Sequence, residues 1–147
     1  MSTPAWWSEL LGASEVLAES DHEEVREWQS QPDNADPVIP TERDAEDVPP
    51  VTARLSLLAG AFRRNVPTMP AEERRRVLDV LESIMATKGH EDRTAVGTGF
   101  LEPLLMAWDR GFDLHFIWGE LGRESRSFCL ELNEFWGVKS PDWMRGE

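Results

Sequence analysis

Two glycines around a threonine, in the stretch AVGTGFLEPLL over residues 95–105, are the first candidate for chemistry. A Gly-rich turn between a strand and a helix can bind phosphate, because its backbone N–H groups converge on the anion. Here the preceding residues are charged and helix-like, the third glycine of a dinucleotide-binding motif is missing, and no Lys-Ser or Lys-Thr follows. Pro103 lies four residues after Gly99, where a glycine allows a helix to bend around the proline ring. The pattern therefore predicts that Gly97 and Gly99 are close-packing and bending residues of a helix.

Other catalytic combinations are sparse. The histidines, His22, His90 and His115, lack the three- or four-residue spacing of a helical metal pair. Cys129 is the only cysteine, so no internal disulfide can form, and its place on an apolar helical stripe favours a core thiol. A Cys129–His115 nucleophile pair stays open as the basis of a small helical enzyme. Enzyme activity, a cofactor and a metal site are otherwise not expected.

The charge distribution is more informative. The net charge is −13. Residues 1–50 contain 13 acidic and 2 basic residues, a balance of −11, whereas residues 51–147 contain 15 acidic and 13 basic residues, a balance of −2. An acidic surface repels nucleic acid and anionic membranes and accelerates the encounter with basic proteins. We therefore expect a basic protein partner and neither nucleic-acid nor membrane binding, with a purely solubilising acidic tract as the alternative.

Tryptophan beside carboxylates suits the binding of a basic surface, because arginine and lysine can pair with the acids and stack on the ring. The chain holds seven tryptophans and no tyrosine. For Trp28 the alternative is that its ring docks the first helix on the core. The predicted partner-binding residues are acids of the first helix, the adjoining tryptophan and acids of the following loop, namely Glu19, Asp21, Glu23, Glu24, Glu27, Trp28, Asp44, Glu46 and Asp47.

Helices must position these residues, because no stretch alternates apolar and polar residues as a strand does. The 147 residues predict one all-α domain, a bundle of about six helices, with HEAT-like stacking of helix pairs left open. The helices are expected from Thr3-Pro4 to about Trp28 with any break near Ser20-Asp21, from Val51 to Phe62, from Thr68 to Gly89, from His90 to Trp108, from Asp113 to Gly122, and from about Ser125 to Gly137.

Several features outside the helical pattern complete these expectations. Five prolines and many acids make residues 30–50 a long acidic Pro-rich loop, and residues 138–147 a loosely ordered tail anchored by Trp143. The last helix carries an apolar stripe that ends in Phe135 and Trp136, which are expected in the core.

The start of the chain lacks the pattern of a signal peptide and no apolar run could span a bilayer, which favours the cytoplasm. Three consecutive arginines are expected to pair with acids of their own helix; they are Arg74, Arg75 and Arg76, with Glu72, Asp79 and Glu82.

The segments VLDVLESIMATKGHEDRTAVGTGFLEPLL and IWGELGRESRSFC, over roughly residues 77–129, resemble a family of small all-helical bacterial proteins. That family resembles immunity proteins encoded beside polymorphic or contact-delivered toxins. The matching positions are Leu81-Glu82, Gly89, Ala95-Val96, Phe100-Leu101-Glu102, Leu104, Leu121-Gly122 and Ser125-Arg126. Pro103, Trp108 and the acidic segment 30–50 depart from the pattern. The resemblance supplies no catalytic residues.

The resemblance and the charge imply the same function, an immunity protein that neutralises a cognate basic toxin through an acidic surface. An acidic adaptor or secretion chaperone is the alternative, and a small helical enzyme is a weaker one. An adaptor differs from an immunity protein in that its partner is not toxic by itself. The enzyme hypothesis predicts that His115→Ala or Cys129→Ser abolishes function without unfolding the chain.

Overall fold

The computed structural model describes residues 3–30 and 48–146, and in that part of the chain the architecture is all-helical without strands, as predicted. The helices in chain order are α1 (Trp6–Gly12), α2 (Glu15–Ser30), α3 (Val51–Asn65), α4 (Ala71–Thr87), α5 (His90–Val96), the π-helical η1 (Gly97–Leu101), α6 (Glu102–Trp108), α7 (Leu114–Trp118), α8 (Arg123–Trp136) and the 3₁₀ turn η2 (Asp142–Arg145). Most of the expected acidic loop at 30–50 falls outside the described residues.

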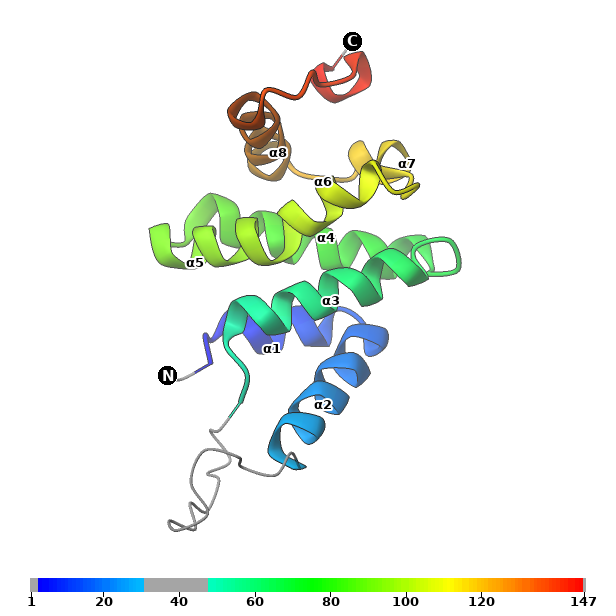
Figure 1. Cartoon of the computed structure of the whole chain (residues 1–147). Coiled ribbons are helices and arrows are strands. Elements are labelled where there is room, and N and C mark those ends of the chain that lie inside the picture. Colours follow the sequence, from blue (N-terminus) through cyan, green and yellow to red (C-terminus); the bar gives the residue numbers. More distant parts are fainter. Residues whose placement is uncertain (1–2, 31–47, 147) are drawn as a thin grey trace.

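The helices are arranged in layers along the molecule (Figure 1). Helices α1 and α2 form one end, α3 crosses next to them, and α4 lies beside the continuous helix formed by α5, η1 and α6. Helices α7 and α8 and the η2 turn form the opposite end. The acidic α2 and the C-terminal residues are therefore far apart in the molecule.

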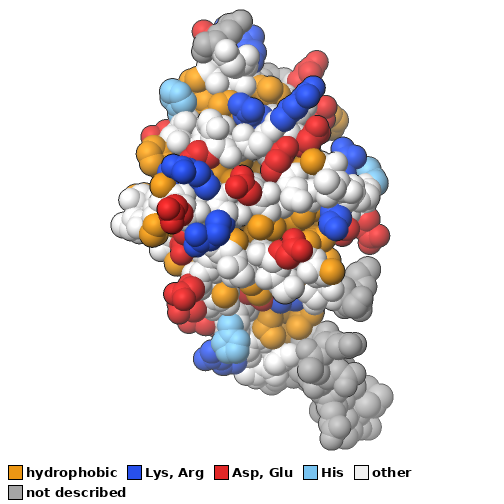
Figure 2. Space-filling view, turned by 180° about the vertical axis from the view of Figure 1, so that it is seen from behind, with side chains coloured by type: hydrophobic (Ala, Val, Ile, Leu, Met, Phe, Trp, Pro, Cys, Tyr) orange, Lys and Arg blue, Asp and Glu red, His pale blue; other side chains and the backbone are white. Residues whose placement is uncertain are grey.

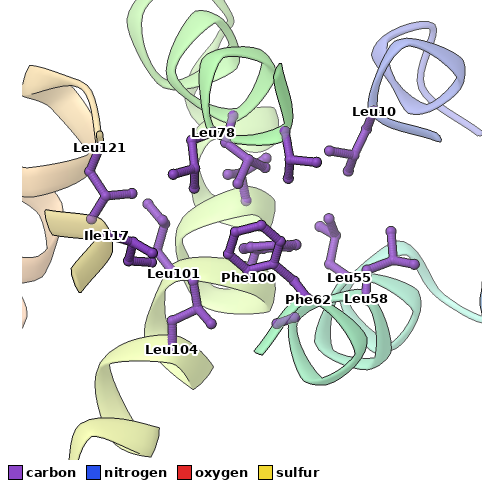
Figure 3. Packing of buried hydrophobic residues seen from close by; sticks show 14 of the residues in the cluster. Leu10, Leu55, Leu58, Phe62, Leu78, Phe100, Leu101, Leu104, Ile117 and Leu121 are labelled. Atoms are coloured by element: carbon purple, nitrogen blue, oxygen red, sulfur yellow. The ribbon is translucent and has the colours of Figure 1, made fainter. Parts of the chain in front are cut away.

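The core lies where α3, α4 and the α5–η1–α6 helix meet. Figure 3 shows Leu55 and Phe62 of α3 pointing toward Phe100 of η1, with Leu10 of α1 and Leu78 of α4 closing the cluster. The ring centroids of Phe62 and Phe100 lie 5.7 Å apart. Helix α4 buries one apolar stripe in this core, made of Val77, Leu78, Leu81, Ile84 and Met85. A core of this kind stabilises by apolar burial, at about 25 cal/mol per Å² removed from water.

The first predicted helix forms two helices, α1 and α2, and the described residues otherwise have about the number of helices expected. The break lies at Ala13 and Ser14, and α2 runs through the Ser20-Asp21 position where a break was expected. The Ser14 hydroxyl accepts a hydrogen bond from the Leu17 amide at 3.4 Å, the arrangement of a helix N-cap. Ser14 therefore begins a new helix, where the sequence pattern placed it on the face of one long helix.

The glycine pair packs as predicted. A Cβ atom on Gly97 would lie 2.5 Å from the Phe128 ring of α8, and one on Gly99 would lie 2.8 Å from the Leu55 Cβ of α3. The Glu102 amide donates to the carbonyl of Gly97, five residues earlier, which is the wider turn of a π-helix. In a regular α-helix the ring of Pro103 would clash with the carbonyl four residues earlier, that of Gly99. The wider π-turn relieves this clash, so the helix continues to Trp108.

A Gly99→Ala variant is expected to lose about 1–3 kcal/mol of unfolding free energy, because Leu55 Cβ and the Thr52 carbonyl cannot move away without shifting α3. Gly12→Ala is the matched control, since nothing lies within 4 Å of a Cβ at that helical position. Denaturant unfolding of the two variants measures the difference. Equal stability of both variants would contradict close packing at Gly99.

The C-terminal region differs from the sequence-based expectation in two respects. Phe135 and Trp136, predicted as core residues, are exposed, because periodicity marks a face of α8 and not how far neighbouring helices extend along it. The tail, predicted to be loosely ordered, forms η2 and buries Met144. Trp143 anchors it as predicted, with its ring 5.2 Å from that of Trp108. Gly137 ends α8 at a φ of 71°, also as predicted.

Candidate partner-binding surface

The exposed face of α2 carries a row of carboxylates. Glu19, Glu23 and Glu27 are exposed and follow one another at four-residue spacing, and Glu24 lies half-buried beside them. We call these four residues the acidic α2 surface. Like charges at this spacing destabilise a helix by about 0.2–0.5 kcal/mol per pair. A bound cationic group would remove that repulsion, so the row favours a basic ligand.

A hollow adjoins the acidic α2 surface where α2 meets α3. Its α2 side is formed by Ser20, Glu23, Glu24, Arg26 and Glu27, and its α3 side by Leu57 and Arg64. Leu57 is exposed there and offers an apolar contact beside the carboxylates. Elsewhere, Figure 2 shows acidic and basic side chains interspersed over most of the visible face. This distribution agrees with the net charge of only −2 for residues 51–147. The three carboxylates of the hollow outnumber the two guanidinium groups of Arg26 and Arg64, so the hollow favours a ligand that presents a cationic group next to an apolar one.

Asp21, predicted as a partner-binding residue, is buried in the core with 4% of its area exposed. Arg54 of α3 donates to both carboxylate oxygens, at 2.8 Å from Nε and 2.6 Å from Nη2, and the Trp7 indole donates at 3.2 Å. The Arg54 guanidinium also lies over the Trp7 ring, 4.6 Å from its centre. The assignment is corrected because Asp21 lies four residues after the buried Leu17, on the face of α2 that packs against α3. That spacing was the signal in the sequence.

The remaining predicted residues lie at or beyond the end of α2. Trp28 is exposed in the last turns of the helix, beside Glu27. Asp44, Glu46 and Asp47 lie outside the described residues, so their place in a binding surface stays a prediction. The structure therefore brings together Glu19, Glu23, Glu24, Glu27 and Trp28 on one helix and removes Asp21 from the set.

The three arginines of α4 do not pair with acids of their own helix. Arg74 donates to Glu120 with N–O distances of 2.6 and 3.1 Å, and Arg75 donates to the same carboxylate at 3.2 Å. Arg76 donates to the Ala13 carbonyl. The Arg74 guanidinium also lies 4.8 Å from the centre of the Phe116 ring. Arg74 and Arg75 therefore join the start of α4 to the turn after α7, Arg76 joins α4 to the turn between α1 and α2, and the three do not form a free anion site.

Burial acts to raise the pKa of Glu120, but the hydrogen bonds and charges of Arg74 and Arg75 outweigh it, so this pKa lies below its usual 4.5. A carboxylate with a lowered folded-state pKa stabilises the fold at pH values above its unfolded-state pKa. Its contribution to the free energy of unfolding is lost as pH falls through the folded-state pKa.

Glu120→Gln is thus expected to be less stable than the parent chain at neutral pH, with the difference shrinking below about pH 4.5. Urea unfolding at several pH values measures this difference, and a gap independent of pH would contradict the ion pair.

Three positions of the family-like pattern meet at the joint between α4 and α8. The Glu82 carboxylate accepts hydrogen bonds from the amides of Glu124 and Ser125 and from the Ser125 hydroxyl, each at 2.9 Å. Gly122 lies so close to Glu82 that a Cβ atom would overlap its side chain. Glu82 thus caps the first turn of α8, where the helix dipole favours an anion. These positions of the pattern have a structural role.

The pair considered for catalysis does not have the properties of a nucleophile and its base. Cys129 is buried, and burial raises the pKa of its thiol to about 12, so the thiol is protonated at neutral pH. His115 is exposed and stacks on the Trp143 ring, with ring centroids 4.4 Å apart.

Among residues 3–30 and 48–146, no group of three His, Cys, Asp or Glu side chains is placed to hold a metal ion. None of the helices in the described part has both the length and the apolar character needed to cross a membrane.

Comparison of this chain with known proteins identifies no relative. No protein-family model matches the chain, and neither a curated protein nor a solved structure shows significant similarity to it. Function must therefore be argued from the charge, the exposed residues and the geometry described above.

Proposed function

We propose that this chain is a protein-binding immunity protein that neutralises a cognate basic toxin through its acidic α2 surface. The observation that carries the proposal is the exposed row of Glu19, Glu23 and Glu27 on α2, of which Glu23 and Glu27 line the hollow between α2 and α3. The row has an energetic cost in the free chain and becomes favourable when a cationic surface covers it. The resemblance expected for residues 77–129, to a family of small bacterial proteins similar to immunity proteins, agrees with this proposal.

Association and dissociation would depend on different residues. Carboxylates around the hollow steer a basic partner and raise the association rate, an effect that weakens as salt screens the charges. The exposed Leu57 supplies an apolar contact that is not screened and that slows dissociation. The hydrophobic contact alone is too small for tight binding, so the charge complementarity is the larger part of recognition.

Growth rescue tests this function. Each neighbouring open reading frame is expressed in a naive host with and without this chain, and any pair that forms is purified. The immunity proposal requires that one neighbour arrests growth, that this chain restores it and that the two proteins co-purify. A partner that co-purifies without being toxic would replace the proposal with the adaptor or secretion-chaperone function. If no neighbour binds, the proposal is wrong.

A further inference from the structure

The end of α2 that carries most of the acidic α2 surface extends beyond the core. Within α2, which lies wholly in the described part of the chain, Leu17 and Asp21 are the buried residues, and those after Asp21 are half-buried or exposed. Figure 1 shows the C-terminal end of α2 slanting away from α3. Asp21 is thus the last buried residue of the helix before Glu23, Glu24 and Glu27.

We infer that Asp21 and Arg54 are positioning residues, whose ion pair fixes the direction in which α2 presents its carboxylates. Apolar burial is non-directional, so Leu17 holds α2 near the core without fixing its direction. An arginine–carboxylate pair with two hydrogen bonds fixes orientation as well as distance. The orientation is a property of the free chain, and its consequence for binding rests on the proposed function.

The Arg54 guanidinium is itself held in place. Its Nη1 donates to the Thr3 hydroxyl at 3.4 Å, and it lies over the Trp7 ring of α1 while its Nε and Nη2 bind Asp21. The side chains of Arg54 and Asp21 are each 6% exposed, so salt screens the pair little. Buried ion pairs add little net stability over apolar residues, and their best documented role is to specify one packing arrangement.

A small rotation at this junction displaces the acidic α2 surface by an amount that matters for binding. Glu27 lies six residues after Asp21. At about 1.5 Å per residue this is about 9 Å, so a tilt of about 20° moves Glu27 by about 3 Å. A displacement of that size breaks a charge-assisted hydrogen bond, which needs donor and acceptor within about 2.9 Å. The ion pair therefore decides whether the carboxylates meet the cationic groups of a partner.

Pulsed electron paramagnetic resonance of the full chain measures the direction of α2 through the distance between two spin labels. One label is placed at Arg26→Cys on α2 and the other at Lys88→Cys after α4, where both positions are exposed, whereas Cys129 is buried. The parent chain with these labels is expected to give one narrow distribution of the α2 distance. A reference pair at Lys88→Cys and Glu134→Cys, also exposed, reports on the rest of the fold.

Asp21→Asn combined with Arg54→Met removes the ion pair but keeps the net charge and an acceptor for the Trp7 indole. This variant should broaden the distribution of the α2 distance at least about twofold or shift its mean by about 3 Å, with the reference distance unchanged. Arg54→Lys keeps the charge without the two-point contact and should broaden the distribution as well. Leu17→Val is the matched control, because it trims an apolar contact of α2 and should leave the distribution unchanged.

An unchanged α2 distance in both variants of the ion pair would overturn the inference. A change in the reference distance as well would also overturn it, because the pair would then hold the whole fold and not the direction of α2.

Binding provides a second measurement, made with the partner found by growth rescue. The variant with Asp21→Asn and Arg54→Met should dissociate at least about tenfold faster at nearly the parent association rate, because its net charge and long-range steering are kept. An unchanged dissociation rate would contradict the positioning role. If no partner exists, the proposed function is wrong, while the label distances still decide whether the ion pair orients α2.

Discussion

Asp21→Ala is expected to lower the free energy of unfolding by about 3–5 kcal/mol, because it leaves the Arg54 guanidinium buried without its partner. The Trp7 indole would lose its hydrogen-bond acceptor at the same time. Denaturant unfolding, followed by helical circular dichroism, measures the loss. Glu23→Ala, an exposed acid half a turn further along α2, is the control and should change stability by less than about 0.5 kcal/mol.

A double-mutant cycle separates the ion pair from other effects of the substitution. Asp21→Ala combined with Arg54→Met removes both charges and leaves no unpaired buried ion, so the double variant should be less destabilised than the sum of the two single variants. Additive losses, or a loss below about 1 kcal/mol for Asp21→Ala, would contradict a buried pair that joins α2 to α3. The same experiment distinguishes a structural Asp21 from the partner-binding Asp21 that the sequence suggested.

Reversal of Glu19, Glu23 and Glu27 to lysine is expected to reduce the association rate with the toxin at least about tenfold at low salt, because the steering field changes sign. The parent chain should lose association rate steeply as salt is added. Surface plasmon resonance with the partner found by growth rescue measures both effects. The triple variant should also fail to restore growth.

The matched control reverses three exposed acids away from α2, namely Glu91, Glu131 and Glu134. Both triple variants change the net charge by the same amount, so a general charge effect would alter them equally. A specific acidic α2 surface requires a much larger loss for Glu19, Glu23 and Glu27. Equal losses in the two variants, or association that is independent of salt, would rule out the assignment of the binding surface.

The elements of the fold follow from local patterns in the sequence. The sequence pattern predicted helices α3 and α4, and Gly137 predicted the end of α8. The glycines around Thr98 predicted close packing, which their contacts with Phe128 and Leu55 confirm. Such predictions succeed because they depend on residues within one or two turns of each other. The break at Ser14 was missed because the serine side chain competes with the helical pattern that surrounds it.

The candidate partner-binding surface was likewise predictable from the sequence only in part. Exposed acids at four-residue spacing were visible in the sequence, since a helix places them in one row. The four-residue spacing from Leu17 marked Asp21 as facing the core, but the arginine that pairs with it was not visible, and Asp21 was assigned to the surface with its neighbours. The exposure of Phe135 and Trp136 was also missed, because the stripe of α8 resembles a core face until the ends of the neighbouring helices are known.

By itself, the sequence determined the helical class, most helix ends, the packing glycines and the location of the negative charge. Each of these depends on short-range backbone preferences or on composition. Only the tertiary structure decided the partners of the charged residues. Arg54 meets Asp21 across 33 positions, Glu82 meets Glu124 across 42, and Arg74 meets Glu120 across 46. Pairing over such distances depends on how whole helices pack, and the pattern of any single helix carries no information about it.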